Sequence, residues 1–147
     1  MIRRLHPLLG GIALALVASF WISSLAVEIM GDGAAILAVK TSILYAMILL
    51  IPAMAGAGAT GFRLGAHMKH PLVAGKRRRM PAIALNGLLV LLPCAIFLQA
   101  RAAAGEFDGW FTAAQGLELA AGALNIALLA RSLRDGHALA QRRTRAA

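Results

Sequence analysis

The chain has 147 residues, of which 60% are hydrophobic and only 14% are charged. A soluble domain of this composition would lack enough polar residues to cover its surface, so the sequence favours an integral membrane protein. The formal net charge of +9 would also suit a nucleic-acid-binding protein. The basic residues, however, lie between and beside apolar segments with almost no aromatic residues among them, so we predict no nucleic-acid partner.

Four apolar segments, each long enough to cross a hydrocarbon core of about 30 Å, follow one another along the chain. They cover residues 8–29, 34–62, 82–100 and 110–130. A cleaved signal peptide is the competing interpretation of the first segment. Its apolar run is longer than a signal peptide usually has, and further spans follow, so we interpret it as a membrane-spanning helix.

Short polar turns separate the first segment from the second and the third from the fourth, which forces each pair to pack antiparallel. The expected fold is therefore all-α: an integral-membrane four-helix bundle made of two antiparallel helical hairpins. We assign residues 1–135 to this transmembrane domain and residues 136–147 to a basic tail. Pro52 is expected to kink the second helix, and Pro81 suits the first turn of the third.

A basic segment, residues 63–80, connects the two hairpins and is expected to be a loop. It contains 6 Lys and Arg residues, the N-terminus has 2 and the chain from Arg131 onward has 5, so all but two of the 15 lie on one side. Cytoplasmic loops are rich in Lys and Arg, so we predict an N-in, C-in topology in the bacterial inner membrane. Anionic lipid headgroups are the expected partners of the basic cluster Lys76, Arg77, Arg78 and Arg79.

Ionisable side chains inside a membrane are costly, so each needs a partner or a function. At about 1.5 Å per helical residue, Lys40 lies about 10 Å and Glu118 about 12 Å inward from the outer turns. Glu28 lies nearer the outer surface. Lys40 therefore has two candidate partners: Glu118 across the bundle, or Glu28 if the lysine side chain extends outward.

The fourth segment carries a polar stripe, in which Gln115, Glu118, Gly122 and Asn125 recur at spacings of three, four and three. Residues at this spacing share one helix face, which we expect to face the bundle interior. Asn86 enters the third segment from the opposite side at a similar depth, so an amide pair with Asn125 is predicted. Such residues either only join the helices, or form a proton or cation relay or a pocket for a small ligand such as a quinone.

The end of the second segment is almost free of large side chains. Ala53, Ala57, Gly61 and Gly65 recur there every four residues. Small residues at this spacing let another helix approach closely. We therefore predict a helix-packing face at these four positions.

All four histidines fall on the predicted cytoplasmic side. His6 precedes the first apolar segment and His67 follows the second, so an antiparallel hairpin would bring them to matching depth, as a bis-histidine haem requires. His67 and His70 are three residues apart, which suits a metal ion only if that segment is helical. Haem b or a metal ion is therefore the candidate cofactor. The alternative is that these histidines are ordinary polar residues at the membrane interface.

The arrangement of LHPLLGGIALAL, FWISSLAVEI, VKTSILYAMILLIPAMAGAGATGFRLG and RMPAIALNGLLVLLP resembles that of small four-helix inner-membrane proteins of proteobacteria. The resemblance covers nearly the whole chain and implies the four-span fold without an established activity. A looser similarity is to four-helix b-type cytochromes and copper-resistance-type membrane proteins. It implies at most one haem, on the cytoplasmic side, because no histidine lies near the outer face.

No nucleophile with a neighbouring base, no phosphate-binding loop and no carboxylate dyad is recognisable in the sequence, so we predict that the chain is not an enzyme. The leading hypothesis is a scaffold or accessory subunit that packs against partner helices, in a membrane complex or a homo-oligomer. The second is a redox protein that binds haem or a metal ion through His6 and His67. The third is a proton-coupled carrier centred on Glu118 and Lys40.

Overall fold

The computed structural model describes residues 2–65 and 71–145, which are almost entirely helical. In chain order the helices are α1 (Ile2–Met30), α2 (Gly33–Gly65), α3 (Pro71–Asn86), the π-helical turn η1 (Gly87–Leu91), α4 (Leu92–Ala103) and α5 (Gly109–Arg145). Because α3, η1 and α4 follow one another without a break, they form one continuous rod, which we call the third span.

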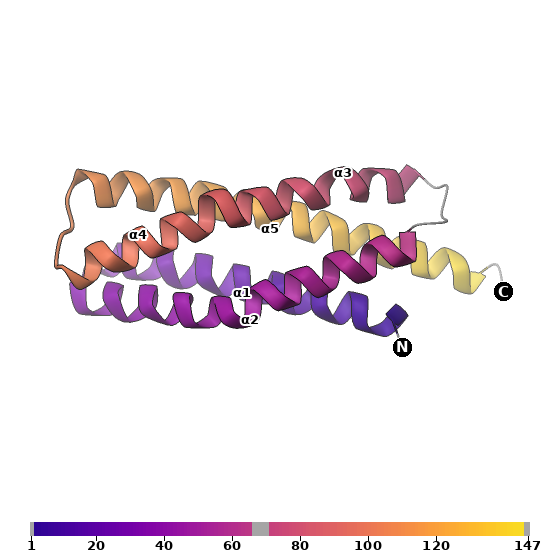
Figure 1. The fold of residues 1–147 in the computed structure, drawn as a ribbon, viewed down its shortest axis with the longest axis horizontal. Coiled ribbons are helices and arrows are strands. Elements are labelled where there is room, and N and C mark those ends of the chain that lie inside the picture. Colours follow the sequence, from indigo (N-terminus) through magenta and orange to yellow (C-terminus); the bar gives the residue numbers. More distant parts are fainter. Residues whose placement is uncertain (1, 66–70, 146–147) are drawn as a thin grey trace.

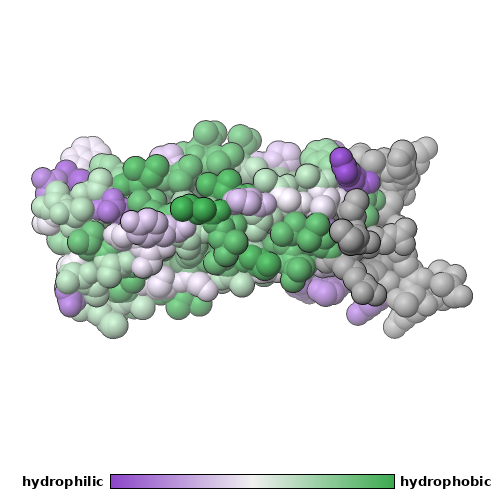
Figure 2. Space-filling model, turned by 60° about the horizontal axis from the view of Figure 1, so that its bottom comes forward, coloured by the Kyte–Doolittle hydropathy of each residue, from purple (hydrophilic) through white to green (hydrophobic). Residues whose placement is uncertain are grey.

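The helices run along one long axis of the molecule (Figure 1). Within the described ranges, four segments are long and apolar enough to cross a membrane: Leu5–Met30, Gly33–Gly65, Arg78–Ala103 and Gly109–Ala138. Hydrophobic residues cover most of the middle of the face shown in Figure 2, and hydrophilic residues gather towards its ends. The prediction of an all-helical bundle with four apolar helices is confirmed, and these helices suggest a multi-pass membrane protein.

The start of α1 and the end of α5 lie at one end of the bundle, which we call the terminal end, and the two hairpin turns lie at the opposite end, which we call the turn end (Figure 1). Each turn contains a glycine in the left-handed region, Gly31 with φ 69° and Gly105 with φ 71°. This conformation ends a helix at little steric cost only when the residue has no Cβ. An aspartate then begins the next helix in both hairpins, because Asp32 accepts from Ala34 N–H and Asp108 from Phe111 N–H.

The basic segment differs from its predicted loop. Helix α3 begins at Pro71 and includes residues 71–80, so Pro81 lies inside the helix instead of in its first turn. Arg79 helps to hold this extension in place, since its Nε donates to the Gly75 carbonyl and its guanidinium pairs with Asp135 on α5. Helix α5 also continues to Arg145, so the described part of the basic tail is helical.

A π-helical turn interrupts the third span, where the sequence predicted a regular helix. Leu92 N–H donates to the Gly87 carbonyl, five residues back. Pro93 follows at the next position and has no N–H to donate, so the regular hydrogen-bond ladder is already broken there. The π turn widens the helix locally and re-aims the side chains around it.

The helices do not close the bundle equally along its length. Helix α1 packs against α2 and α5, and α4 packs against both α2 and α5. Helix α3 packs on α5 but makes little contact with α2. Figure 1 also shows α2 changing direction near its middle, and the proline inside this helix is Pro52. The bundle is therefore closed at the turn end and less closed between α2 and α3.

Candidate functional site

A buried ion pair lies in the turn-end half of the bundle. Lys40 on α2 points its Nζ at Oε2 of Glu118 on α5, at 2.5 Å. The Lys40 side chain is fully buried and that of Glu118 is 11% exposed. Of the two pairings that the sequence left open for Lys40, the structure shows the one with Glu118. This pair joins the two hairpins across the interior.

Ser24 on α1 completes the pair to a three-member network. Lys40 Nζ donates to Ser24 Oγ at 3.1 Å, and Ser24 Oγ donates to Glu118 Oε2 at 3.5 Å. A serine beside a lysine can be a nucleophile with its base. Here the lysine donates to the hydroxyl and to a carboxylate, so it is not placed to take the serine proton. The network therefore connects α1, α2 and α5 without forming an activated nucleophile.

Two further polar side chains lie on the same helices, about one turn from this network. Gln115 is buried, and neither of its amide atoms has a hydrogen-bond partner among the described residues. Glu28 Oε1 is also buried without one in the described part of the chain. With Gly122 and Asn125, the stripe on α5 is buried throughout, which confirms that it faces the bundle interior.

The predicted amide pair is present nearer the terminal end. Asn86 Nδ2 donates to Asn125 Oδ1 at 2.9 Å and to the Ala121 carbonyl, also at 2.9 Å. Asn125 Nδ2 in turn reaches the Ile83 carbonyl at 3.5 Å. Asn86 is the residue immediately before the π turn, so these bonds fix the third span to α5 where its backbone ladder changes register.

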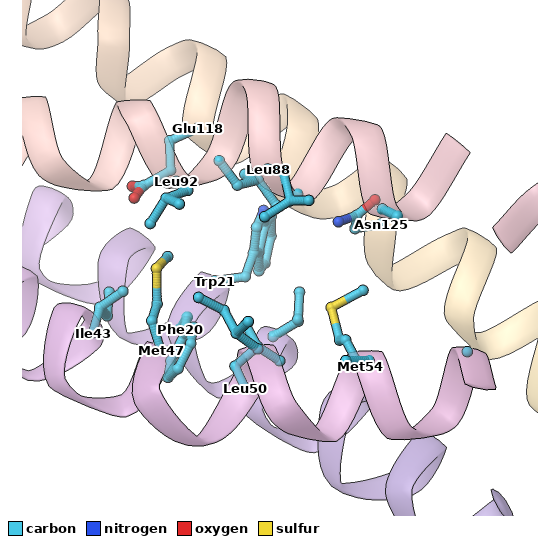
Figure 3. Close-up of a pocket in the computed structure, with 18 of the residues that line it drawn as sticks. Phe20, Trp21, Ile43, Met47, Leu50, Met54, Leu88, Leu92, Glu118 and Asn125 are labelled. Atoms are coloured by element: carbon cyan, nitrogen blue, oxygen red, sulfur yellow. The ribbon is translucent and has the colours of Figure 1, made fainter. Parts of the chain in front are cut away.

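A cavity of about 350 Å³ lies between the two hairpins. Figure 3 shows Leu88, Leu92 and Glu118 on one side and Ile43, Met47, Leu50 and Met54 on the other. Ser24, Glu118 and Asn125 line it among mostly apolar side chains. A volume of this size falls within the range of about 300–1,000 Å³ that is usual for ligand pockets. The cavity is a mostly apolar space with a few polar groups on its wall.

Exposed lining residues mark where the cavity opens. On α2 they include Ile51, Ala55 and Phe62, and on α3 they include Pro81 and Ala84. The lining residues nearest the turn end are instead buried, among them Ser24, Ile43 and Glu118. The cavity thus opens sideways between α2 and α3 and ends blindly at the ion pair.

Trp21 on α1 forms part of the cavity wall and also closes the bundle against α5. Its Nε1 donates to the Leu119 carbonyl at 2.8 Å. A Cβ added to Gly122 would lie 3.0 Å from Trp21 Cδ1, so the indole fits there because residue 122 has no side chain. In Figure 3 the Trp21 side chain reaches across between the two sides of the cavity.

The predicted helix-packing face is covered by α1 of the same chain. Ala53, Ala57 and Gly65 are buried, and a Cβ at Gly61 would lie 3.0 Å from His6 Cε1. His6 Nδ1 lies 3.0 Å from the Ala57 carbonyl oxygen and 3.0 Å from Thr60 Oγ1. His6 therefore joins α1 to α2, and this face is already occupied within the monomer.

The haem and metal predictions rest largely on residues that the structure does not describe. His67 and His70 both lie in residues 66–70, outside the described ranges. No group of three or more His, Cys, Asp or Glu residues suited to a metal ion occurs in the part of the chain that is described. The haem hypothesis, like the carrier hypothesis for Glu118 and Lys40, stays a prediction.

The structure describes the side chains of only two of the four residues in the basic cluster. Lys76 and Arg77 belong to α3, but the description does not extend to their side chains. Arg78 is exposed, and Arg79 pairs with Asp135. At the turn end, Arg101 pairs with Glu106 at 2.7 Å and with Asp108. The Phe111 backbone N–H and the Arg101 guanidinium hold the pKa of Asp108 below its usual value.

Sequence reasoning missed the cavity, the role of Trp21 and the hydrogen bond that Lys40 donates to Ser24. A cavity depends on how far two helices separate, which periodicity does not specify. Ser24 and Trp21 did carry a signal, because they lie three residues apart on α1 and so share one helix face.

The sequence matches no protein-family model, no curated protein and no solved structure.

Proposed function

We propose that this chain is a non-enzymatic, multi-pass inner-membrane protein that binds a hydrophobic ligand between its two hairpins. The observation that carries the proposal is the mostly apolar cavity of about 350 Å³ that opens sideways between α2 and α3. A sideways opening inside an apolar bundle gives access from the hydrocarbon region of a bilayer rather than from water. The polar residues Ser24, Glu118 and Asn125 would orient a ligand in an otherwise unselective space.

The proposed orientation places the terminal end in the cytoplasm. It rests on the distribution of Lys and Arg, of which all but two of the 15 precede the first span, lie between the hairpins or follow the fourth span. The turn end, with Asp32, Glu106 and Asp108, would then face the periplasm. In this orientation the cavity opens towards the cytoplasmic leaflet, because its exposed lining residues extend to Phe62 and Pro81 towards the terminal end.

Tryptophan fluorescence provides a direct test. The chain has two tryptophans, and only Trp21 lines the cavity, so a Trp110→Phe protein carries one reporter. A brominated alkyl maltoside, which quenches indole fluorescence on contact, is titrated into the purified protein. We expect saturable quenching of Trp21, because the alkyl chain enters the cavity.

A matched pair of variants shows whether the quenching comes from the cavity. Ala84→Phe fills an exposed position of the lining, whereas Ala82→Phe adds the same ring at an exposed position of α3 outside it. We expect Ala84→Phe to abolish the saturable quenching and Ala82→Phe to preserve it. Equal quenching in all three proteins would contradict the proposal, because the maltoside would then reach Trp21 without using the cavity.

The second candidate function is that of a scaffold that self-associates, and the exposed face of α5 favours it. Small residues recur there at alternating spacings of four and three: Gly109, Ala113, Gly116, Ala120, Ala123 and Ala127, all exposed. A Cβ at Gly116 would meet nothing within 4 Å, so this face is open in the monomer. Two copies of such a face can approach closely in lipid.

The oligomeric state of the purified protein tests this second candidate. A dimer that dissociates in Gly116→Leu but persists in Ala100→Leu, on the exposed side of α4, would support it. A monomeric wild-type protein in several mild detergents and in nanodiscs would count against self-association.

A further inference from the structure

The cavity has a polarity along its length that restricts what can enter it. Its blind end is formed by Ser24 and Glu118, next to the buried Lys40. An ion pair already uses the Glu118 carboxylate there, and an anionic group brought beside it would be repelled. A ligand with an anionic headgroup must therefore enter with its apolar chain first and leave its headgroup at the opening.

The residues next to the opening are positively charged, opposite in sign to an anionic headgroup. Phe62 lines the cavity and is followed in α2 by the exposed Arg63. Met80 and Pro81 line it on α3 and are preceded by the exposed Arg78. An exposed arginine on each of the two helices thus lies within one turn, along the chain, of residues that line the opening. Arginine suits the planar, bidentate recognition of phosphate.

The length of the cavity matches one leaflet. Along the third span the lining extends from Met80 to Leu92, a distance of twelve residue steps, or about 18 Å at about 1.5 Å per step. Half of a hydrocarbon core of about 30 Å is about 15 Å. A lipid chain that starts at the terminal-end interface would therefore end near the blind wall at Glu118.

From these three observations we infer that the ligand is an anionic phospholipid of the cytoplasmic leaflet, bound with one acyl chain in the cavity and its phosphate at Arg63 and Arg78. The inference rests on the proposed function and specifies its ligand. A free fatty acid and a neutral lipid are the other occupants that the experiment distinguishes. Binding places the lipid between α2 and α3, where the protein itself makes little contact.

The test compares brominated lipids in nanodiscs that contain the Trp110→Phe protein. Brominated phosphatidylglycerol in a phosphatidylcholine host is compared with brominated phosphatidylcholine at the same mole fraction, with unlabelled phosphatidylglycerol keeping the surface charge equal. We expect stronger quenching of Trp21 by the anionic lipid. The double variant Arg63→Gln/Arg78→Gln should lower this preference by roughly fivefold for each arginine removed.

A control separates local recognition from general attraction to a basic surface. Arg131→Gln/Arg134→Gln removes two exposed charges from α5 at the same end, away from the lining residues of that helix. We expect the preference for phosphatidylglycerol to survive in this variant. An equal loss in both double variants would overturn the inference, because the attraction would then belong to the whole surface.

The remaining outcomes separate the inference from the function on which it rests. Saturable quenching by the alkyl maltoside without any preference for phosphatidylglycerol overturns the lipid assignment and leaves the hydrophobic-ligand function intact. Brominated fatty acid that displaces phosphatidylglycerol at equal mole fraction also overturns the assignment. Absence of quenching by all brominated compounds, with the fold verified by circular dichroism, overturns both.

Discussion

The two halves of the bundle are held together in different ways. In the turn-end half, Lys40, Ser24 and Glu118 join α1, α2 and α5 through hydrogen bonds, and α4 packs against α2. In the terminal-end half, the third span is bonded to α5 through Asn86 and Arg79. Among the side chains described, no hydrogen bond joins α2 to the third span in either half. The cavity opens where α2 and α3 lack both polar bonds and close packing.

In the lipid environment that we propose for this chain, the solvent explains the difference. In water, apolar faces of neighbouring helices are driven together, but lipid chains are as apolar as leucine and exert no such force. Helices in a bilayer stay together where they pack closely or share hydrogen bonds. Where neither holds, as between α2 and α3, a lipid chain can take the place of a protein contact. The buried polar residues of this chain therefore also determine where the bundle stays open.

The largest effect is expected in the turn-end half, which we call the closed half, when its buried ion pair loses one of the two charges. Among the described residues, Glu118→Leu leaves the fully buried Lys40 ammonium with Ser24 alone as a hydrogen-bond partner. Removing one member of a buried ion pair typically costs about 3–5 kcal/mol, because the other charge stays desolvated. We expect a large drop in thermal stability in detergent, followed by circular dichroism.

The double variant Lys40→Met/Glu118→Leu serves as the control for this prediction. It removes both charges and keeps the volume similar, so most of the lost stability should return. A double variant as unstable as Glu118→Leu would mean that packing at position 118, rather than the unpaired ammonium, causes the loss.

A smaller effect is expected at the boundary between the halves, where Trp21 fits against Gly122. Gly122→Ala places a Cβ 3.0 Å from the indole, and overpacking of this kind costs about 1–3 kcal/mol. The same change at Gly116, which has no neighbour within 4 Å, should instead stabilise α5 by up to about 1 kcal/mol. Thermal melts of the two variants should therefore shift in opposite directions, and equal shifts would contradict this account.

The buried stripe on α5 and its partners show which part of the site could be predicted from the sequence. The spacing of Gln115, Glu118, Gly122 and Asn125 was enough to predict a buried stripe. Depth counting was enough to predict the pair of Asn86 with Asn125, but it left Lys40 with Glu118 and Glu28 as candidate partners. Both arguments use only helical geometry and the cost of isolated polar groups in lipid. They specify which faces point inward, but not how closely the faces meet.

The features that escaped prediction depend on tertiary distances. The helix at residues 71–80 is supported by the pair between Arg79 and Asp135, 56 positions apart in the chain. The π turn follows Asn86, whose side chain bonds to Asn125, 39 positions away. The cavity depends on the separation of α2 from α3. The small-residue face at Ala53 and Ala57 was recognised as a packing face, yet the sequence did not show that α1 of the same chain covers it.

In the terminal-end half, which we call the open half, loss of the pair between Asn86 and Asn125 should lower the stability less than loss of one charge of the ion pair. Asn125→Leu removes the bond to Asn86 and the donation to the Ile83 carbonyl. Hydrogen bonds between membrane helices contribute about 0.6 kcal/mol on average and at most about 1.7 kcal/mol. Asn86 keeps its bond to the Ala121 carbonyl, so we expect a cost near the average. A loss as large as that of Glu118→Leu would show that the π turn itself depends on this pair.

The smallest effect concerns the outermost part of the closed half, where Asp108 begins α5. Its pKa is lowered first by the Phe111 N–H and then by the hydrogen bond from Arg101. A carboxyl group whose pKa is lowered in the folded state stabilises the fold at any pH above its pKa in the unfolded chain, which is about 3.9. This contribution is lost as the pH falls through the lowered pKa of the folded state. The start of α5 should therefore loosen only in strong acid.

Carbon-detected NMR of the Asp108 carboxyl group measures this directly. Arg101→Gln should raise the pKa of Asp108 towards its usual value but not fully, because the bond from the Phe111 N–H remains. Exchange of the Phe111 amide proton, followed over the same pH range, should accelerate at higher pH in the variant than in the wild type. An unchanged pKa in Arg101→Gln would assign the shift to the helix start alone and remove Arg101 from the set of residues that hold the turn end closed.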